Sequence, residues 1–91
     1  MPTPTIYIRF NYTEDSGGRY EVAASDINNA LDGAVFEPTI EGFRALGRYI
    51  SRRWPDRNVF CSPDLEYPEE FGIELDKDQI RAAIIEGENE S

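Results

Sequence analysis

Apolar and polar side chains alternate over two segments near the N-terminus, and this alternation limits the fold more than any other feature. An apolar side chain occupies every second position in residues 3–12 and 19–24, in the order Ile6, Ile8, Phe10 and then Tyr20, Val22, Ala24. This two-residue period is typical of half-buried strands. The polar residues 13–18 include two adjacent glycines, which suit a turn because glycine accepts positive φ. We therefore predict an N-terminal β-hairpin with one apolar face.

Residues 40–53 have the periodicity of an amphipathic helix. A start signal, Pro38-Thr39, precedes the segment, and its apolar stripe consists of Ile40, Phe43, Leu46, Gly47, Ile50 and Trp54. Pro55 ends the helix, because the residue before a proline is disfavoured in helical backbone. Since Trp54 lies on the stripe, we expect it to belong to the core.

A second helix is predicted to begin at Asp76. Gln79 follows three residues later and completes a capping-box pattern. The apolar positions that this helix would bury are Ile80, Ala83 and Ile84. Gly87 is the expected stop, because glycine often follows the last helical residue. Residues 87–91 are then predicted to form a flexible tail.

Residues 26–36 allow two interpretations. In the first, Ser25 or Asp26 caps a short helix that ends near Phe36. The apolar face of that helix would consist of Ile27, Ala30, Leu31, Ala34 and Val35. In the second, Asp32-Gly33 is a hairpin turn between two short strands. We favour the helix, and the sequence leaves the alternative open.

Two short strands and a loop complete the predicted architecture. Residues 57–62 and 71–75 each have the pattern of a strand, and residues 62–70, with two prolines and four acidic residues, indicate an exposed loop. The fold class is therefore α+β. We expect a small, mostly antiparallel sheet, made of the hairpin and the two short strands, with two or three helices on one face. A chain of 91 residues suits one domain, predicted over 1–86.

Missing residue types exclude several kinds of site. The chain has no histidine and a single cysteine, Cys61. It therefore lacks Ser/His and Cys/His nucleophile pairs, Cys/His zinc sites and an intramolecular disulfide. Cys61 follows Phe60 in an apolar segment, so we expect a buried thiol. We expect no catalytic residue, cofactor or metal. Without a signal peptide or an apolar stretch of about 18 residues, a cytoplasmic protein that does not contact membranes is predicted.

The net charge of −9 is distributed unevenly along the chain. Residues 1–43 hold two arginines and seven acids (net −5), residues 44–57 five arginines and one acid (net +4), and residues 58–91 two basic residues and ten acids (net −8). This charge disfavours direct binding to nucleic acid and suits a basic protein surface as partner. Its alternative role is solubility alone. The candidate partner-binding residues are Asp64, Glu66, Glu69, Glu70, Glu74, Asp76 and Asp78.

Arg44, Arg48 and Arg52 recur every four residues on the predicted helix 40–53, and so form one ridge turned away from its apolar stripe. This arginine ridge is an alternative partner-binding surface for phosphate or carboxylate groups, in an accessory module or a homo-oligomer. The competing interpretation is that these arginines pair with Glu41 and with acids of neighbouring elements.

The chain resembles the small acidic inhibitors encoded by phages and mobile elements, including anti-CRISPR and DNA-mimic proteins. The resemblance rests on size, acidity, the hairpin Thr5–Ala24 leading into a polar-capped helix, and the lack of catalytic residues, rather than on a shared motif. It implies a protein that blocks a nucleic-acid-handling complex by occupying its basic surface. The first hypothesis is thus a non-enzymatic binding protein. The alternatives are the arginine-ridge module and a small metal-dependent hydrolase built on carboxylates.

Overall fold

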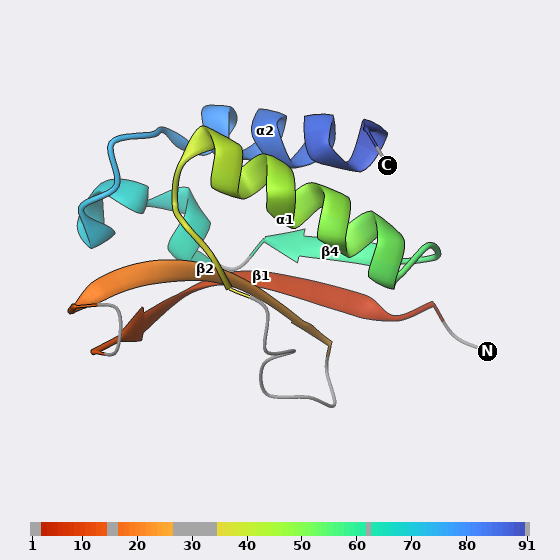
Figure 1. Ribbon diagram of the computed structural model, residues 1–91, viewed down its shortest axis with the longest axis horizontal. Coiled ribbons are helices and arrows are strands. Elements are labelled where there is room, and N and C mark those ends of the chain that lie inside the picture. The colour runs from red at the N-terminus through yellow and green to blue at the C-terminus, as the bar shows by residue number, and fades with distance from the viewer. Residues whose placement is uncertain (1–2, 15–16, 27–34, 62, 91) are drawn as a thin grey trace.

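The chain folds into a β-sheet that two α-helices cover on one face (Figure 1). The computed structural model describes residues 3–14, 17–26, 35–61 and 63–90. In chain order, with η marking a 3₁₀ helix, the elements are β1 (Thr5–Thr13), β2 (Arg19–Asp26), β3 (Val35–Phe36), α1 (Ile40–Arg53), β4 (Asn58–Cys61), η1 (Pro63–Glu66), η2 (Pro68–Phe71) and α2 (Lys77–Asn89). The predicted α+β class is confirmed.

The sheet has the strand order β3-β2-β1-β4. β1 and β2 form the predicted hairpin, in which Ile8 lies opposite Ala24 and Phe10 opposite Val22. β4 joins the other edge of β1 in parallel. The sheet is therefore mixed, with two antiparallel pairings and one parallel pairing. A parallel pair needs a long connection between its strands, and here that connection includes α1.

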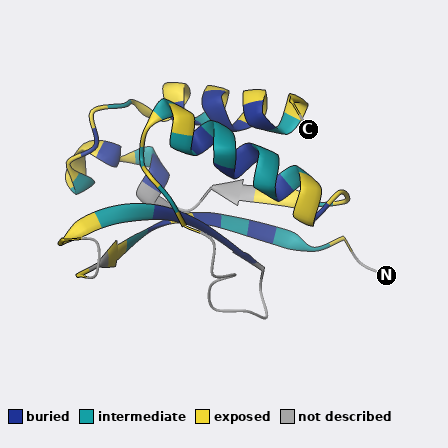
Figure 2. Ribbon diagram, viewed as in Figure 1, coloured by how far each residue is buried: buried dark blue, intermediate teal, exposed yellow. Residues whose placement is uncertain are grey.

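The apolar faces of the sheet and of both helices meet in one core (Figure 2). Its fully buried side chains include Ile6, Ile8, Val22, Phe43, Leu46, Ile50, Leu65 and Ile80. Apart from Leu65, these are positions that strand alternation and helical periodicity predict. Burying a side chain of this size stabilises the fold by about 1.5–3 kcal/mol. The same core therefore fixes both helices on the sheet.

Both helices begin as the sequence predicts. Thr39 is the N-cap of α1, and its hydroxyl accepts a hydrogen bond from the Gly42 N–H (3.1 Å). α2 shows the full capping box between Asp76 and Gln79. At the other end of α1, Trp54 leaves the helical conformation just before the proline and is buried, as expected.

The strand predicted over 71–75 is wrong. Phe71 ends η2, and Gly72 then turns the chain in a left-handed conformation (φ 73°). Ile73 is buried and Leu75 is half-buried against the core, but neither belongs to a strand. The apolar alternation of residues 71–75 therefore reflects packing over one end of the core and not pairing in the sheet.

The exposed loop predicted over 62–70 is also wrong. From residue 63 onward this segment folds into η1 and η2, and Ser62 lies outside the described residues. Leu65 has no exposed surface, and Pro68 is buried as well. The acidic composition favours a loop, but these two apolar side chains hold the segment on the core.

The helix predicted to end near Phe36 is wrong at its end. Val35 and Phe36 form β3, which pairs antiparallel with β2. Asp26 is the last residue of β2. The remainder of that prediction, residues 27–34 with the alternative Asp32-Gly33 turn, lies outside the described residues. Of the two short strands predicted beyond the hairpin, β4 is confirmed, and β3 replaces the strand at 71–75.

α1 and α2 are in close contact through two glycines. A methyl group at Gly47 would overlap the carbonyl oxygen of Ile84, and a methyl group at Gly87 would overlap the carbonyl oxygen of Arg44. Gly87 is therefore a contact residue inside α2 and not the predicted helix stop. The tail predicted over 87–91 consequently begins within the helix.

Replacing Gly47 with alanine is expected to lower the free energy of unfolding by about 1–3 kcal/mol, the usual cost of overpacking. This loss should outweigh the roughly 1 kcal/mol that alanine gains over glycine in helix propensity. Urea denaturation measures the difference. Ile85→Ala is the control, because Ile85 is exposed on α2 and its truncation should change stability by no more than about 0.5 kcal/mol. A Gly47→Ala variant as stable as the parent would contradict the close contact.

Candidate functional site

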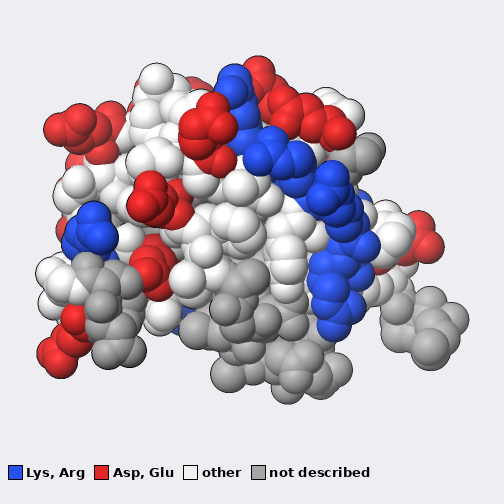
Figure 3. Space-filling model, in the orientation of Figure 1, with Lys and Arg blue, Asp and Glu red and all other residues white. Residues whose placement is uncertain are grey.

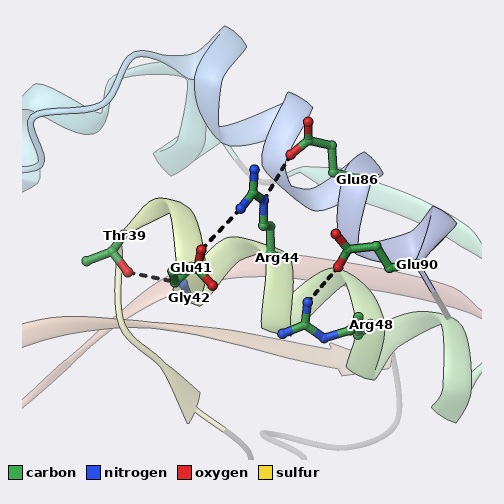
Figure 4. Close-up of polar contacts among 7 residues, drawn as sticks. All are labelled: Thr39, Glu41, Gly42, Arg44, Arg48, Glu86 and Glu90. Carbon is green, nitrogen blue, oxygen red and sulfur yellow. Dashed lines mark hydrogen bonds and ion pairs between the residues drawn. The ribbon is translucent and has the colours of Figure 1, made fainter.

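The arginine ridge lies along α1, and Figure 3 shows basic side chains as a band that follows this helix. Two of its three arginines make ion pairs with glutamates of the same chain (Figure 4). Arg44 contacts Glu86 through Nε (2.9 Å) and Glu41 through Nη1 (3.1 Å). Arg48 Nη1 contacts Glu90 Oε2 at 2.7 Å. Glu86 and Glu90 belong to α2 or its end, so the ridge joins the two helices, as the competing interpretation predicts.

The pairing with α2 leaves Arg44 positively charged, because a guanidinium is protonated at any physiological pH. The Glu86 carboxylate raises the pKa of Arg44, first through the hydrogen bond and then through charge attraction. Arg52, the third member, is exposed and makes no ion pair with another described residue. It lines a hollow of about 430 Å³ together with Phe36, Ala45, Arg48, Tyr49 and Arg53. Arg52 is therefore the ridge arginine best placed to meet an outside group.

A fourth arginine makes the most buried of the helix-joining ion pairs. Arg57, just beyond α1, donates to Glu88 Oε1 from both Nε (3.0 Å) and Nη2 (2.7 Å). Its Nη1 donates to the carbonyl oxygens of Trp54 (3.0 Å) and Pro55 (3.2 Å). The two side chains of the pair are only 17% and 20% exposed. This arrangement ties the end of α1 to the last turn of α2.

Two of the acidic residues that we predicted to bind a partner make contacts within the fold, and one of the two, Asp76, is nevertheless exposed. Glu66 is half-buried and pairs with Lys77 (3.3 Å) and with Arg81. Asp76 accepts a hydrogen bond from the backbone of α2 as its N-cap. The side chain of Asp64 lies outside the described part of the structure. Glu66 therefore pairs with basic side chains of α2, and Asp76 caps that helix.

The other four carboxylates are exposed and form what we call the acidic surface: Glu69, Glu70, Glu74 and Asp78. They lie on η2, on the segment that follows it and on the first turn of α2. None of them makes an ion pair with another described residue. In Figure 3, acidic side chains appear at several places on the left side of the molecule and along its upper edge.

A groove opens beside the acidic surface, between the start of β2, the loop before α1 and the end of η2. Its main cleft measures about 470 Å³ and is lined by Gly18, Arg19, Tyr20, Glu21, Glu37, Pro38, Thr39, Phe71, Gly72 and Ile73. A second cleft of about 320 Å³ shares four of these residues and extends to Glu74 and Leu75. We call the two clefts together the η2 groove. Through Glu74 it is continuous with the acidic surface.

The sequence did not reveal the η2 groove. Glu21 and Glu37 are far in sequence from the acidic run 64–78, and the hairpin and the loop before α1 bring them to it. The segment 71–75 forms the opposite wall only because it is not the strand that its alternation predicts. The Pro38-Thr39 start signal was the one available hint, since it places Glu37 immediately before a helix.

Comparisons with protein-family models, with curated proteins and with solved structures found no match to this chain. Among the described residues, no three or more Asp, Glu or Cys side chains gather as ligands for a metal ion. No helix in the described ranges is long and apolar enough to cross a membrane. The surface and its charges are therefore the basis for a functional proposal.

The difference in burial between two arginine pairs predicts a difference in stability. Arg57→Ala should lower the free energy of unfolding by about 1.5–3 kcal/mol, as expected for buried hydrogen bonds to a charged group. Arg48→Ala removes the same charge from a pair whose side chains are 35% and 49% exposed. It should cost only about 0–1 kcal/mol. Urea denaturation of both variants tests the ranking, and equal losses would contradict it.

Proposed function

We propose that this chain is a non-enzymatic binding protein whose acidic surface engages a basic macromolecular partner, and that it acts in the cytoplasm. The observation that supports the proposal is a difference in pairing: more than half of the basic side chains make ion pairs within the chain, whereas, within the part of the chain that the structure describes, the carboxylates of the acidic surface do not. At least five of the nine basic side chains make ion pairs within the chain: Arg44, Arg48, Arg57, Lys77 and Arg81. The four carboxylates of the acidic surface have no such partner among the described residues.

Four of the unpaired carboxylates therefore lie together on the acidic surface, while others, such as Glu14, Glu37 and Asp56, lie elsewhere on the molecule. Fixed charges of one sign steer an oppositely charged partner and suppress binding of like-charged ones. A nucleic acid would be repelled, whereas the groove of a protein that handles nucleic acid is basic. We therefore propose an inhibitor of a nucleic-acid-binding complex, in the manner of anti-CRISPR and DNA-mimic proteins, as the specific form of this function.

The arginine ridge has less support as the partner-binding surface. Arg44 and Arg48 are already paired with α2, so using them would require their ion pairs to open. Of the three ridge arginines, only Arg52 lacks an ion pair with another described residue. The metal-dependent hydrolase gains no support, because the described carboxylates do not gather as metal ligands.

Two double variants with the same net charge of −7 test the proposal: Glu69→Gln/Glu70→Gln on the acidic surface, and Glu14→Gln/Asp56→Asn elsewhere. Each immobilised protein is mixed with lysate of the native host, and the retained proteins are identified. We expect a basic protein to be retained by the parent and by the control pair, and to be lost from the acidic-surface pair. Raising the salt from about 50 to 500 mM should release it, because salt screens surface charge.

The two double variants separate a local surface from general acidity. Equal loss from both variants would assign the binding to net charge alone. Retention that is unchanged by salt and by both pairs of substitutions would refute the proposed function. Circular dichroism spectra should be identical for all three proteins, because all four replaced side chains are exposed.

A further inference from the structure

The η2 groove has the chemistry to hold a cationic side chain. We propose that it receives an arginine or lysine side chain of the basic partner, and so anchors that partner next to the acidic surface. The inference rests on the proposed function and adds to it the binding mode. The carboxylates of the acidic surface give attraction at a distance, and the groove gives a defined place for one side chain.

Aromatic rings supply one part of this chemistry. Tyr20 and Phe71 are half-buried and line the main cleft, with ring centroids 4.9 Å apart and planes at 81°. The face of an aromatic ring attracts a guanidinium or ammonium group within about 6 Å of its centroid. The aliphatic stem of arginine or lysine can also cover apolar surface while its charged end stays near water.

Carboxylates supply the second part. Glu21 and Glu37 line the main cleft, and Glu74 lines its continuation, against Arg19 as the single basic lining residue. An anionic ligand would face a net negative groove. An uncharged apolar ligand would displace water from carboxylates without replacing their hydrogen bonds, which is costly. A cation is the occupant that suits both the rings and the carboxylates of Glu37 and Glu74, which make no ion pair with another described residue.

The groove is also held in shape by the core. Phe71 packs on Phe10 in β1, with centroids 5.2 Å apart, and Tyr20 packs on Tyr12 at 5.3 Å. Across the groove, the Thr39 N–H donates to the carbonyl oxygen of Glu37 (2.8 Å), which fixes the backbone that carries this carboxylate. A site that is formed before binding loses less conformational entropy when the ligand enters.

Short peptides test the inference without knowledge of the partner. ¹⁵N-labelled protein is titrated with hexa-arginine, hexalysine and hexaglutamate, and backbone amide shifts are followed by NMR. We expect both cationic peptides to shift the amides of Gly18, Thr39 and Gly72, and hexaglutamate to leave them unchanged. The cationic peptide that binds more tightly identifies the preferred side chain.

Single-charge variants locate the binding. Glu37→Gln should weaken cationic-peptide affinity about two- to fivefold, the range of partly exposed charge pairs. Asp56→Asn removes the same charge from an exposed position beyond α1 that lines neither cleft, and it should leave the affinity unchanged. Shifts confined to the acidic surface, equal effects of the two substitutions, or groove shifts with hexaglutamate would each overturn the inference. None of these results would refute the proposed function, which the lysate experiment decides separately.

Discussion

The close contact between α1 and α2 is the constraint on which the rest of the structure depends. Gly47 and Gly87 let the two backbones approach until a single added methyl group would overlap a carbonyl oxygen of the other helix. At that separation the carboxylates of α2 and its end reach the arginines of α1 and of the turn that follows it. The same approach places the apolar stripes of both helices over one face of the sheet.

The charge distribution follows from this contact. A helix rich in arginine would by itself be the basic part of an acidic molecule, and α2 compensates it with glutamates. Carboxylates without an ion pair to another described residue lie elsewhere, on η2 and the approach to α2 and also at Glu14, Glu37 and Asp56. Because Leu65 and Pro68 are buried, the backbone of η1 and η2, which carries Glu69 and Glu70, is held on the core. The proposed binding of a basic partner would use these carboxylates together with the adjacent groove.

Much of the fold could be predicted from local pattern. Alternation of apolar and polar residues predicted the hairpin. Helical periodicity, bounded by Thr39 and Pro55, predicted α1, and the Asp76–Gln79 pair predicted the start of α2. Two of the failures share one cause: at 71–75 and at Gly87, the pattern has a tertiary origin that local rules cannot detect. The alternating apolar residues of 71–75 pack on the core, and Gly87 allows the close contact between α1 and α2. The candidate site divides in the same way. Its exposed acids could be predicted from the sequence, but the groove could not, because it depends on segments that only the fold brings together.

The parallel pairing of β4 with β1 has a consequence for how the molecule forms. The hairpin can close early, since its two strands are neighbours in the chain. The second edge of β1 must wait for Asn58–Cys61, which arrives only after α1. Pairing of such distant segments slows folding, because the loop entropy is lost before the contacts are gained. Until β4 arrives, β1 presents unpaired backbone groups that could pair with another chain. We expect the most aggregation-prone moment in the life of this protein to be this interval, rather than any state of the finished fold.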